Sequence, residues 1–326
     1  MVETTIPFTN NANAGLLYSP YNSIARKYGQ QVLNSYSQLS AELRCDLTSR
    51  QVHEFAQLRK YLVTIDELRP FGSLMPYFIG DYLGVPTKPL DDISRFWIAL
   101  YLWSVSIDKV MDGESTVTPD SHMLHSQLLS YFVESCFAYS TNQTTTSNAM
   151  RSLRKAMFYQ SYSTPGACRE GDVTLEHIRS GKNLLFLAIG HIIADSDDVK
   201  SPLVIDLCER FSSILQSLDD ITDIHDDLER GIKTPIIENL LNTKRDFVLS
   251  EEGILDVLVY SGVLKNELLW MLDDLTHLLS QCPNRDGESF VFIDQLRSTI
   301  RLVIYYLDSD DLDAVRVQIR KLYCNT

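Results

Sequence analysis

Glycine and proline are both scarce in this sequence. Its 326 residues include only 14 glycines and 11 prolines. A long chain with so few helix-breaking residues favours helices over a turn-rich β architecture. The sequence also lacks the patterns G-x-G-x-x-G, G-x-x-x-x-G-K-[ST] and H-E-x-x-H. Nucleotide-binding loops and zincin-type catalysis therefore have no motif support.

Cysteine motifs and long apolar runs are missing as well. The 6 cysteines are scattered, without a C-x-x-C pair or a Cys/His cluster, so neither a zinc site nor a disulfide framework is indicated. The first fifteen residues lack the basic start and apolar core of a secretory signal. The longest apolar run, residues 184–194, is too short to span a bilayer. We therefore expect a cytoplasmic protein with reduced thiols and no membrane span.

Positive charge is in deficit, since the formal net charge is -14. This value argues against nucleic acid or an anionic membrane surface as the main partner. An anionic substrate is still compatible with it, because divalent cations bridge carboxylates to phosphate groups.

Apolar residues recur at spacings of three and four almost throughout the chain, and no repeat or Pro/Ser/Gly-rich linker divides it. We predict an all-α fold: a flexible tail over residues 1–17 and a single helical domain over 18–326. The polar segment 140–148 is expected to be a loop. Helices are expected over 51–63, from Pro70 towards 82, and over 91–111, 120–139, 149–162, 174–195, 202–227, 254–281, 290–307 and 313–323.

The segment SLDDITDIHDDLERGIK, residues 217–233, holds six carboxylates next to an apolar run. Asp219, Asp223 and Asp227 are spaced to share one helix face, and Asp220 is beside the first. Grouping carboxylates on a buried helix is unfavourable, because the charges repel and lose hydration. A magnesium ion would offset both costs. A solvated acidic helix face is the alternative, and the spacing alone does not decide between them.

A second acidic pair, Asp108 and Asp112, follows the apolar run FWIALYLWSV. Gly113 is a natural helix stop, so both acids are expected at a helix C-terminus. There they oppose the helix dipole, and such a local conflict suggests a functional site. The two acidic groups could face each other across one cavity.

These residues resemble the class I isoprenoid (terpenoid) synthase superfamily, in particular trans-prenyl diphosphate synthases and terpene synthases derived from them. The second motif of that family is Q-x-x-D-D-x-x-D-x-x-x-D with a lysine six residues later. It is matched in every column, by Gln216, Asp219, Asp220, Asp223, Asp227 and Lys233. The first motif, D-D-x-x-D, keeps its outer aspartates as Asp108 and Asp112 and has Lys109 in its second column. The match covers roughly residues 68–235.

The resemblance implies a helical bundle, antiparallel and surrounding an active-site cavity, and a homodimer. It implies about three Mg²⁺ ions, for which Mn²⁺ could substitute, bound by Asp108, Asp112, Asp219, Asp220, Asp223 and Asp227. Lys182, in a G-K-T-like setting, would contact the diphosphate with Arg179, Lys233 and Gln216. Without the resemblance, Arg179 and Lys182 would be ordinary surface cations. The catalytic set implied is Asp108, Asp112, Asp219, Asp223 and Lys182.

The sequence departs from the prenyl diphosphate synthases where they bind a second diphosphate. The family segment K-x-x-R-P-F has Asp66 in its lysine column, and no arginine pair follows Asp112. We therefore expect ionisation of one allylic prenyl diphosphate by a terpene synthase or cyclase, without isopentenyl diphosphate. One alternative is a prenyltransferase to a small acceptor such as an amino acid, whose carboxylate Arg69 would bind. The others are a prenyl diphosphate synthase and a non-catalytic relative, which Lys109 supports.

The carbocation formed in such a reaction needs a dry, aromatic-rich pocket. Phe78, Trp97, Tyr101 and Trp103 are candidates for its wall, and ordinary core packing is the alternative for each. Trp103 stands five residues before Asp108, where the resemblance implies that a bulky side chain shortens the pocket. Geranyl or farnesyl diphosphate is therefore the expected substrate.

Overall fold

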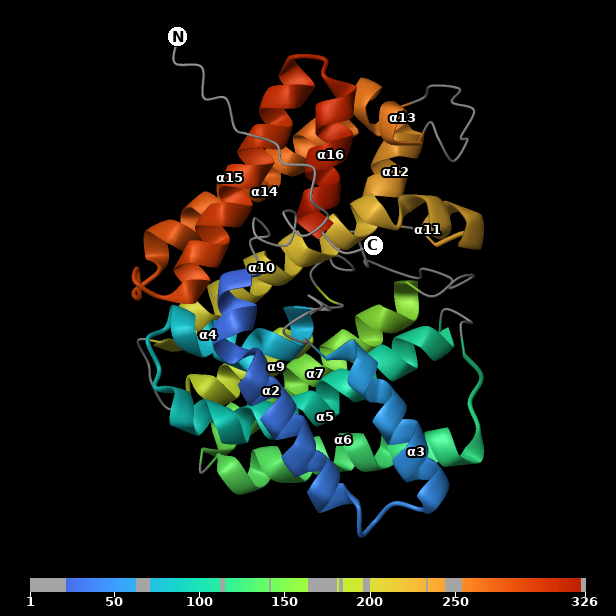
Figure 1. The fold of residues 1–326 in the computed structure, drawn as a ribbon, viewed down its shortest axis with the longest axis vertical. Coiled ribbons are helices and arrows are strands. Elements are labelled where there is room, and N and C mark those ends of the chain that lie inside the picture. The colour runs from blue at the N-terminus through green and yellow to red at the C-terminus, as the bar shows by residue number, and fades with distance from the viewer. Residues whose placement is uncertain are drawn as a thin grey trace.

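The computed structural model describes residues 22–62, 71–111, 115–140, 142–163, 181, 184–195, 200–232, 234–243 and 254–323. Every regular element in these ranges is a helix, which confirms the all-α fold class (Figure 1). None of the described helices has both the length and the apolar character needed to cross a membrane. Among the described cysteines, Cys136, Cys208 and Cys282 are buried free thiols and Cys45 is exposed.

The helices are numbered in the order in which they follow one another along the chain. They are α2 (Asn22–Leu43), α3 (Ser49–Gln57), the 3-10 turns η1 (Leu58–Tyr61) and η2 (Phe71–Leu74), α4 (Met75–Tyr82), α5 (Thr87–Met111), α6 (Pro119–Tyr139), α7 (Gln143–Ser163), α9 (Leu184–Ile193), α10 (Lys200–Thr222), α11 (Ile224–Arg230), α12 (Pro235–Asn242), α13 (Ile254–Tyr260), α14 (Val263–Gln281), α15 (Glu288–Asp308) and α16 (Leu312–Tyr323).

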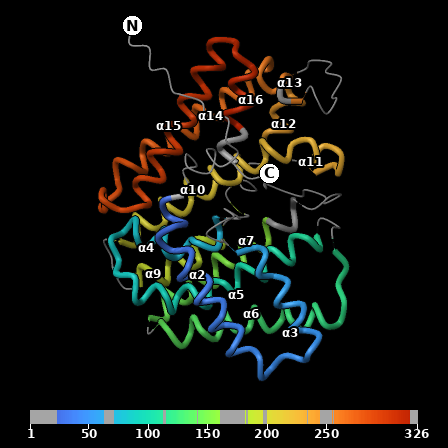
Figure 2. The backbone as a smooth tube through the Cα atoms, viewed as in Figure 1, coloured from blue at the N-terminus to red at the C-terminus, as the bar shows by residue number. Residues whose placement is uncertain are grey.

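Helix α10 connects two groups of helices. In the views of Figures 1 and 2, α3, α5 and α6 lie below it and α12 to α16 lie above it. It packs against α9 on one side and α14 on the other, while α5 packs against α2, α4 and α6. More than half of the residues of α10 are apolar residues or serines whose side chains are buried or partly buried, as expected for a central helix.

Four phenylalanines from four separate elements form an aromatic cluster in the core. Phe71 stacks on Phe292 with ring centroids 4.9 Å apart, and Phe78 stacks on Phe211 at 4.5 Å. The cluster therefore joins η2, α4, α10 and α15. Phe78, Phe211 and Phe292 are each 0% exposed. Buried aromatic pairs of this geometry stabilise a core beyond the area that they remove from water.

A buried carboxylate, Asp81 on α4, joins three helices. Its Oδ1 accepts hydrogen bonds from the Tyr28 hydroxyl at 2.6 Å and from Lys27 Nζ at 2.9 Å. Its Oδ2 accepts one from the Ser289 backbone N–H at 2.8 Å. Burial disfavours the ionised form, but these donors outweigh it and hold the pKa of Asp81 below its ordinary value.

We expect Asp81→Asn to lower the free energy of unfolding by about 1–3 kcal/mol at pH 7, because buried donors lose a charged acceptor. A depressed pKa contributes stability above the unfolded-state pKa of about 3.9, and this contribution is lost as the pH falls through the folded-state value. The gap between wild type and variant should therefore narrow below pH 4 in urea unfolding. Asp92→Asn, at an exposed ion pair with Arg95, is the matched control. An equal loss for both variants would contradict the assignment.

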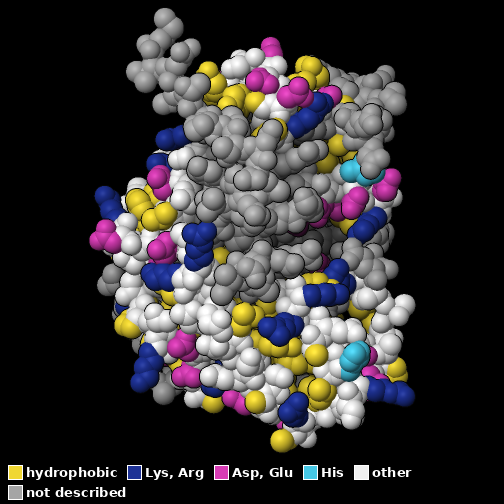
Figure 3. Space-filling view, viewed as in Figure 1, with side chains coloured by type: hydrophobic (Ala, Val, Ile, Leu, Met, Phe, Trp, Pro, Cys, Tyr) yellow, Lys and Arg dark blue, Asp and Glu magenta, His cyan; other side chains and the backbone are white. Residues whose placement is uncertain are grey.

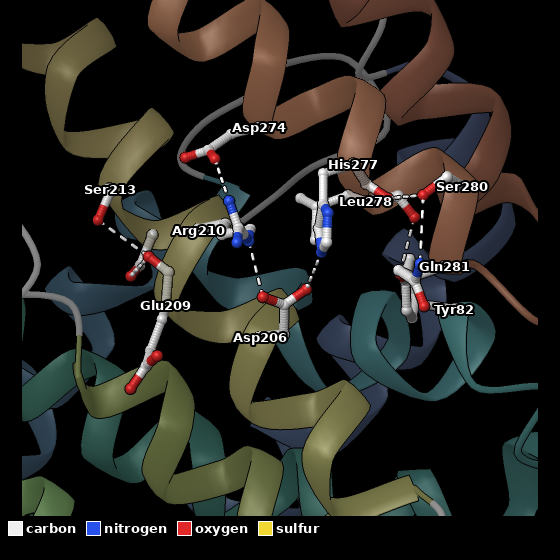
Figure 4. Close-up of polar contacts among 11 residues, drawn as sticks. Tyr82, Asp206, Glu209, Arg210, Ser213, Asp274, His277, Leu278, Ser280 and Gln281 are labelled. Carbon is white, nitrogen blue, oxygen red and sulfur yellow. Dashed lines mark hydrogen bonds and ion pairs between the residues drawn. The ribbon is translucent and has the colours of Figure 1, made fainter.

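Polar contacts fix α10 against α14, as Figure 4 shows. The Asp206 carboxylate accepts from Arg210 Nε at 2.7 Å and lies 2.9 Å from His277 Nε2, and the Arg210 guanidinium also pairs with Asp274. Burial raises the pKa of Asp274, and the pairing with Arg210 only partly opposes this shift. These contacts set the position of the helix that leads to the acidic segment.

Several expected boundaries were wrong. The helix expected over 51–63 ends at Gln57 and is followed by a 3-10 turn to Tyr61, and the helix expected from residue 91 begins at Thr87. Of the helix expected over 174–195, residues 174–180, 182 and 183 lie outside the described residues.

Three further differences have a local explanation. The helix expected from residue 149 begins at Gln143, because the Asn142 side chain accepts the Thr144 N–H at 2.9 Å and the polar segment forms a first helical turn. The helix expected over 202–227 bends at Asp223. The helix expected over 254–281 breaks at Gly262. This glycine has a φ of 78° and lies between the end of α13 at Tyr260 and the start of α14 at Val263. Helices α2 and α12 were not predicted.

Candidate functional site

The acidic segment lies where α10 ends and α11 begins. The Asp223 N–H donates to the Asp219 carbonyl at 2.9 Å, and the Asp227 N–H donates to the Asp223 carbonyl at 2.8 Å. Helical hydrogen bonding thus continues through the bend, and Asp219, Asp223 and Asp227 occupy successive turns. Asp219 and Asp223 are exposed and Asp227 is partly exposed. All three side chains therefore reach the surface.

Asp220 differs from these three because it is buried, with only 3% exposure. Its Oδ1 accepts a hydrogen bond from Gln216 Nε2 at 2.8 Å, and both side chains lie inside. The same helix is held against α14 by Ser217, whose buried hydroxyl donates to Glu267 Oε1 at 2.8 Å. The Ser217–Glu267 contact reaches another helix and therefore restricts the rotation of α10, in which Asp220 is buried and Asp219 is exposed.

The first acidic pair is described only in part. Asp108 is partly exposed in the last turn of α5, and Asp112 lies outside the described residues. Lys109 Nζ lies 5.6 Å from the ring centroid of Tyr61, within range of a cation–π contact. In Figure 1, α5 and the α10–α11 pair run towards the same side of the molecule. Figure 3 shows acidic side chains gathered at that side, at the level of α11.

The donor chemistry of this segment fits magnesium. Carboxylates on successive helical turns are about 5–6 Å apart at Cβ and can hold an ion that keeps several waters. Within the described ranges, no group of three or more His, Cys, Asp or Glu side chains is placed to hold a metal ion. Magnesium binding at this segment stays a prediction from the sequence, in which the ion would keep several waters and also bind an anionic ligand.

Several predicted site residues lie outside the described part of the chain. They are Arg69, Asp112, Arg179, Lys182 and Lys233. Diphosphate contacts of Arg179, Lys182 and Lys233, metal binding by Asp112 and acceptor binding by Arg69 stay predictions from the sequence.

The four aromatic candidates for a pocket wall lie in or near the core. Phe78 belongs to the phenylalanine cluster, and Trp97, also 0% exposed, donates from Nε1 to the Gly72 carbonyl at 2.9 Å. Trp103 and Tyr101 are each 7% exposed. These four side chains belong to the buried hydrophobic core, so their role as a pocket wall stays a prediction.

Tyr101 lies close to the backbone of η2. A Cβ added at Gly72 would lie 2.5 Å from a carbon of the Tyr101 ring, so glycine is required there. Burial raises the pKa of the Tyr101 hydroxyl well above its ordinary value. Tyr101 precedes Asp108 by seven residues, or about two helical turns, and so lies on nearly the same face of α5.

Sequence reasoning did not find the contacts that orient the acidic helix. Ser217 and Glu267 are 50 residues apart, and His277 and Asp206 are 71 apart. Neither pair has a local spacing signal. Only the Gln216–Asp220 pair, at i and i+4, could have been predicted as a helical side-chain contact.

Comparisons with known proteins give no assignment. No family model matches the chain, and neither does any curated protein or solved structure. A function for this chain therefore rests on its own residues.

Proposed function

We propose that this protein is a magnesium-dependent enzyme that ionises a single allylic prenyl diphosphate, of ten or fifteen carbons, and releases diphosphate as a terpene synthase. The observation that carries the proposal is the set Asp219, Asp223 and Asp227, on successive turns at the end of a helix that a buried hydrogen bond joins to α14. It is supported by the match of this segment to the second family motif. The proposed architecture is a class I terpenoid synthase-like bundle.

In this proposal the carboxylates of the acidic segment and of Asp108 hold Mg²⁺, together with Asp112. Bound Mg²⁺ would neutralise charge that develops on the diphosphate leaving group. Arg179, Lys182 and Lys233 would add positive charge around the same group. Buried aromatic side chains of α5 would keep water from the carbocation and stabilise it through their ring faces.

Lys109 is the main objection to catalysis, because it replaces an aspartate of the first motif. Its ammonium group lies over the Tyr61 ring. This contact gives the ammonium group a partner other than the acidic side chains of the motif.

The proposal is tested by incubating the protein with geranyl or farnesyl diphosphate and Mg²⁺, and by analysing diphosphate release and organic products. We expect release that needs Mg²⁺, with hydrocarbon or alcohol products. Release only when an amino acid or another nucleophile is added would assign a prenyltransferase instead. Turnover that requires isopentenyl diphosphate would assign a prenyl diphosphate synthase. No turnover under any of these conditions would refute the proposal.

A further inference from the structure

An open groove runs between α6 and α7, with a volume of about 860 Å³. It forms because α6 packs mainly against α5 whereas α7 packs mainly against α9, which leaves the seam between them unfilled. Its lining runs from Gln143 to Met157 along α7, about 20 Å at 1.5 Å per residue. A helix of about fourteen residues has this length.

The wall of the groove is mostly apolar. Leu129, Val133 and Phe137, spaced by four residues on α6, face Met150, Leu153 and Met157 on α7. Phe137 is 63% exposed and Met157 is 43% exposed. Large apolar side chains this exposed on both sides of one groove are typical of an interaction site.

The charge of the groove selects the kind of partner. Among the described residues that line it, Arg154 is the one that carries a charge. Helix α7 carries three basic residues and no acidic one, in a chain of net charge -14. The N-terminus of α7, with the positive end of its dipole, lies at one end of the groove at Gln143 and Thr146. The local positive charge of Arg154 and of the α7 N-terminus favours acidic groups on the occupant, against the negative charge of the chain as a whole.

We propose that the α6–α7 groove binds an amphipathic helix of a partner protein that has an apolar stripe flanked by Asp and Glu. Apolar residues at i, i+3, i+4 and i+7 would fill the seam between α6 and α7, as in other helix-in-groove complexes. The acidic flank would pair with Arg154. This interaction is independent of the catalytic proposal, because no residue of the groove belongs to the acidic segment.

The test is a selection from a displayed library of fourteen-residue helical peptides with randomised charge. Peptides are selected on the full-length protein and counter-selected on the double variant Phe137→Asp with Met157→Asp, whose exposed positions should tolerate the change. We expect enriched peptides that combine the apolar spacing with a negative net charge. Their affinity should fall at least about tenfold in the double variant, as for a central apolar anchor, and also in Arg154→Glu.

Tyr305→Asp on α15 is the matched control, since Tyr305 is 64% exposed and Phe137 is 63% exposed. It should leave peptide affinity within twofold (~0.4 kcal/mol). Three results would overturn the proposal. They are a selection that yields no peptide preferring the wild type, enrichment of neutral or basic peptides, and light scattering that finds a dimer which Phe137→Asp dissociates. The last would assign the groove to a second copy of the chain.

Discussion

Replacing Asp219 and Asp223 together by alanine is expected to lower kcat/KM for the allylic diphosphate by about 10³-fold or more, because the diphosphate would lose its metal-mediated stabilisation. Both side chains are exposed, so the free energy of unfolding should change little. Steady-state kinetics over a range of Mg²⁺ concentrations, with urea unfolding of the same preparations, measures both effects. Retained activity would refute the metal assignment.

Asp226→Ala is the control for this experiment. Asp226 is exposed on α11, between Asp223 and Asp227, and its Oδ1 lies 3.7 Å from His225 Nδ1. The Asp226→Ala variant removes one carboxylate from the same segment without removing one from the predicted ligand face. Equal losses in Asp226→Ala and in the double variant would mean that total negative charge, rather than three ligands on successive turns, supports activity.

Replacing Phe78 by alanine is expected to lower the free energy of unfolding by about 3–5 kcal/mol, the range for deleting a fully buried aromatic ring. The ring stacks on Phe211 at 4.5 Å and is edge-on to Phe71 at 4.9 Å, so the surrounding side chains cannot easily fill the space. Denaturant unfolding monitored by circular dichroism measures the loss. Phe137→Ala, the same substitution at a position 63% exposed, should change stability by no more than about 0.5 kcal/mol.

This result would separate the two roles considered for Phe78. A core residue gives the large loss in stability. A residue of the pocket wall would give a loss in stability below about 1 kcal/mol and a shift of substrate preference towards longer prenyl diphosphates, as fits a cavity that is already open on one side.

Much of the fold could be predicted from the sequence, because apolar spacing of three and four residues determines helix type and approximate position. The apolar run before Asp108 was expected to end a buried helix, and α5 indeed ends at Met111. The boundaries that failed depend on local backbone chemistry. Asn142 begins a helix inside a segment with loop composition, and Gly262 breaks an uninterrupted apolar pattern.

The site was less predictable than the fold. Spacing placed three aspartates on one face, and their helical hydrogen bonding through the bend agrees with it. Spacing could not show that Asp220 is buried, or that Glu267 fixes Ser217 from another helix. Such contacts depend on which helices become neighbours, and a single sequence does not encode that in any local pattern.

The most direct measurement is a crystal structure of the protein grown with Mn²⁺ and a non-hydrolysable prenyl diphosphate analogue, with the metal located by anomalous scattering. We expect manganese within about 2.0–2.3 Å of carboxylate oxygens of Asp108 and of the Asp219, Asp223 and Asp227 set, with the diphosphate bound to the same metal. A diphosphate bound elsewhere, or manganese found only at other surface acids such as Asp308 to Asp313, would contradict it.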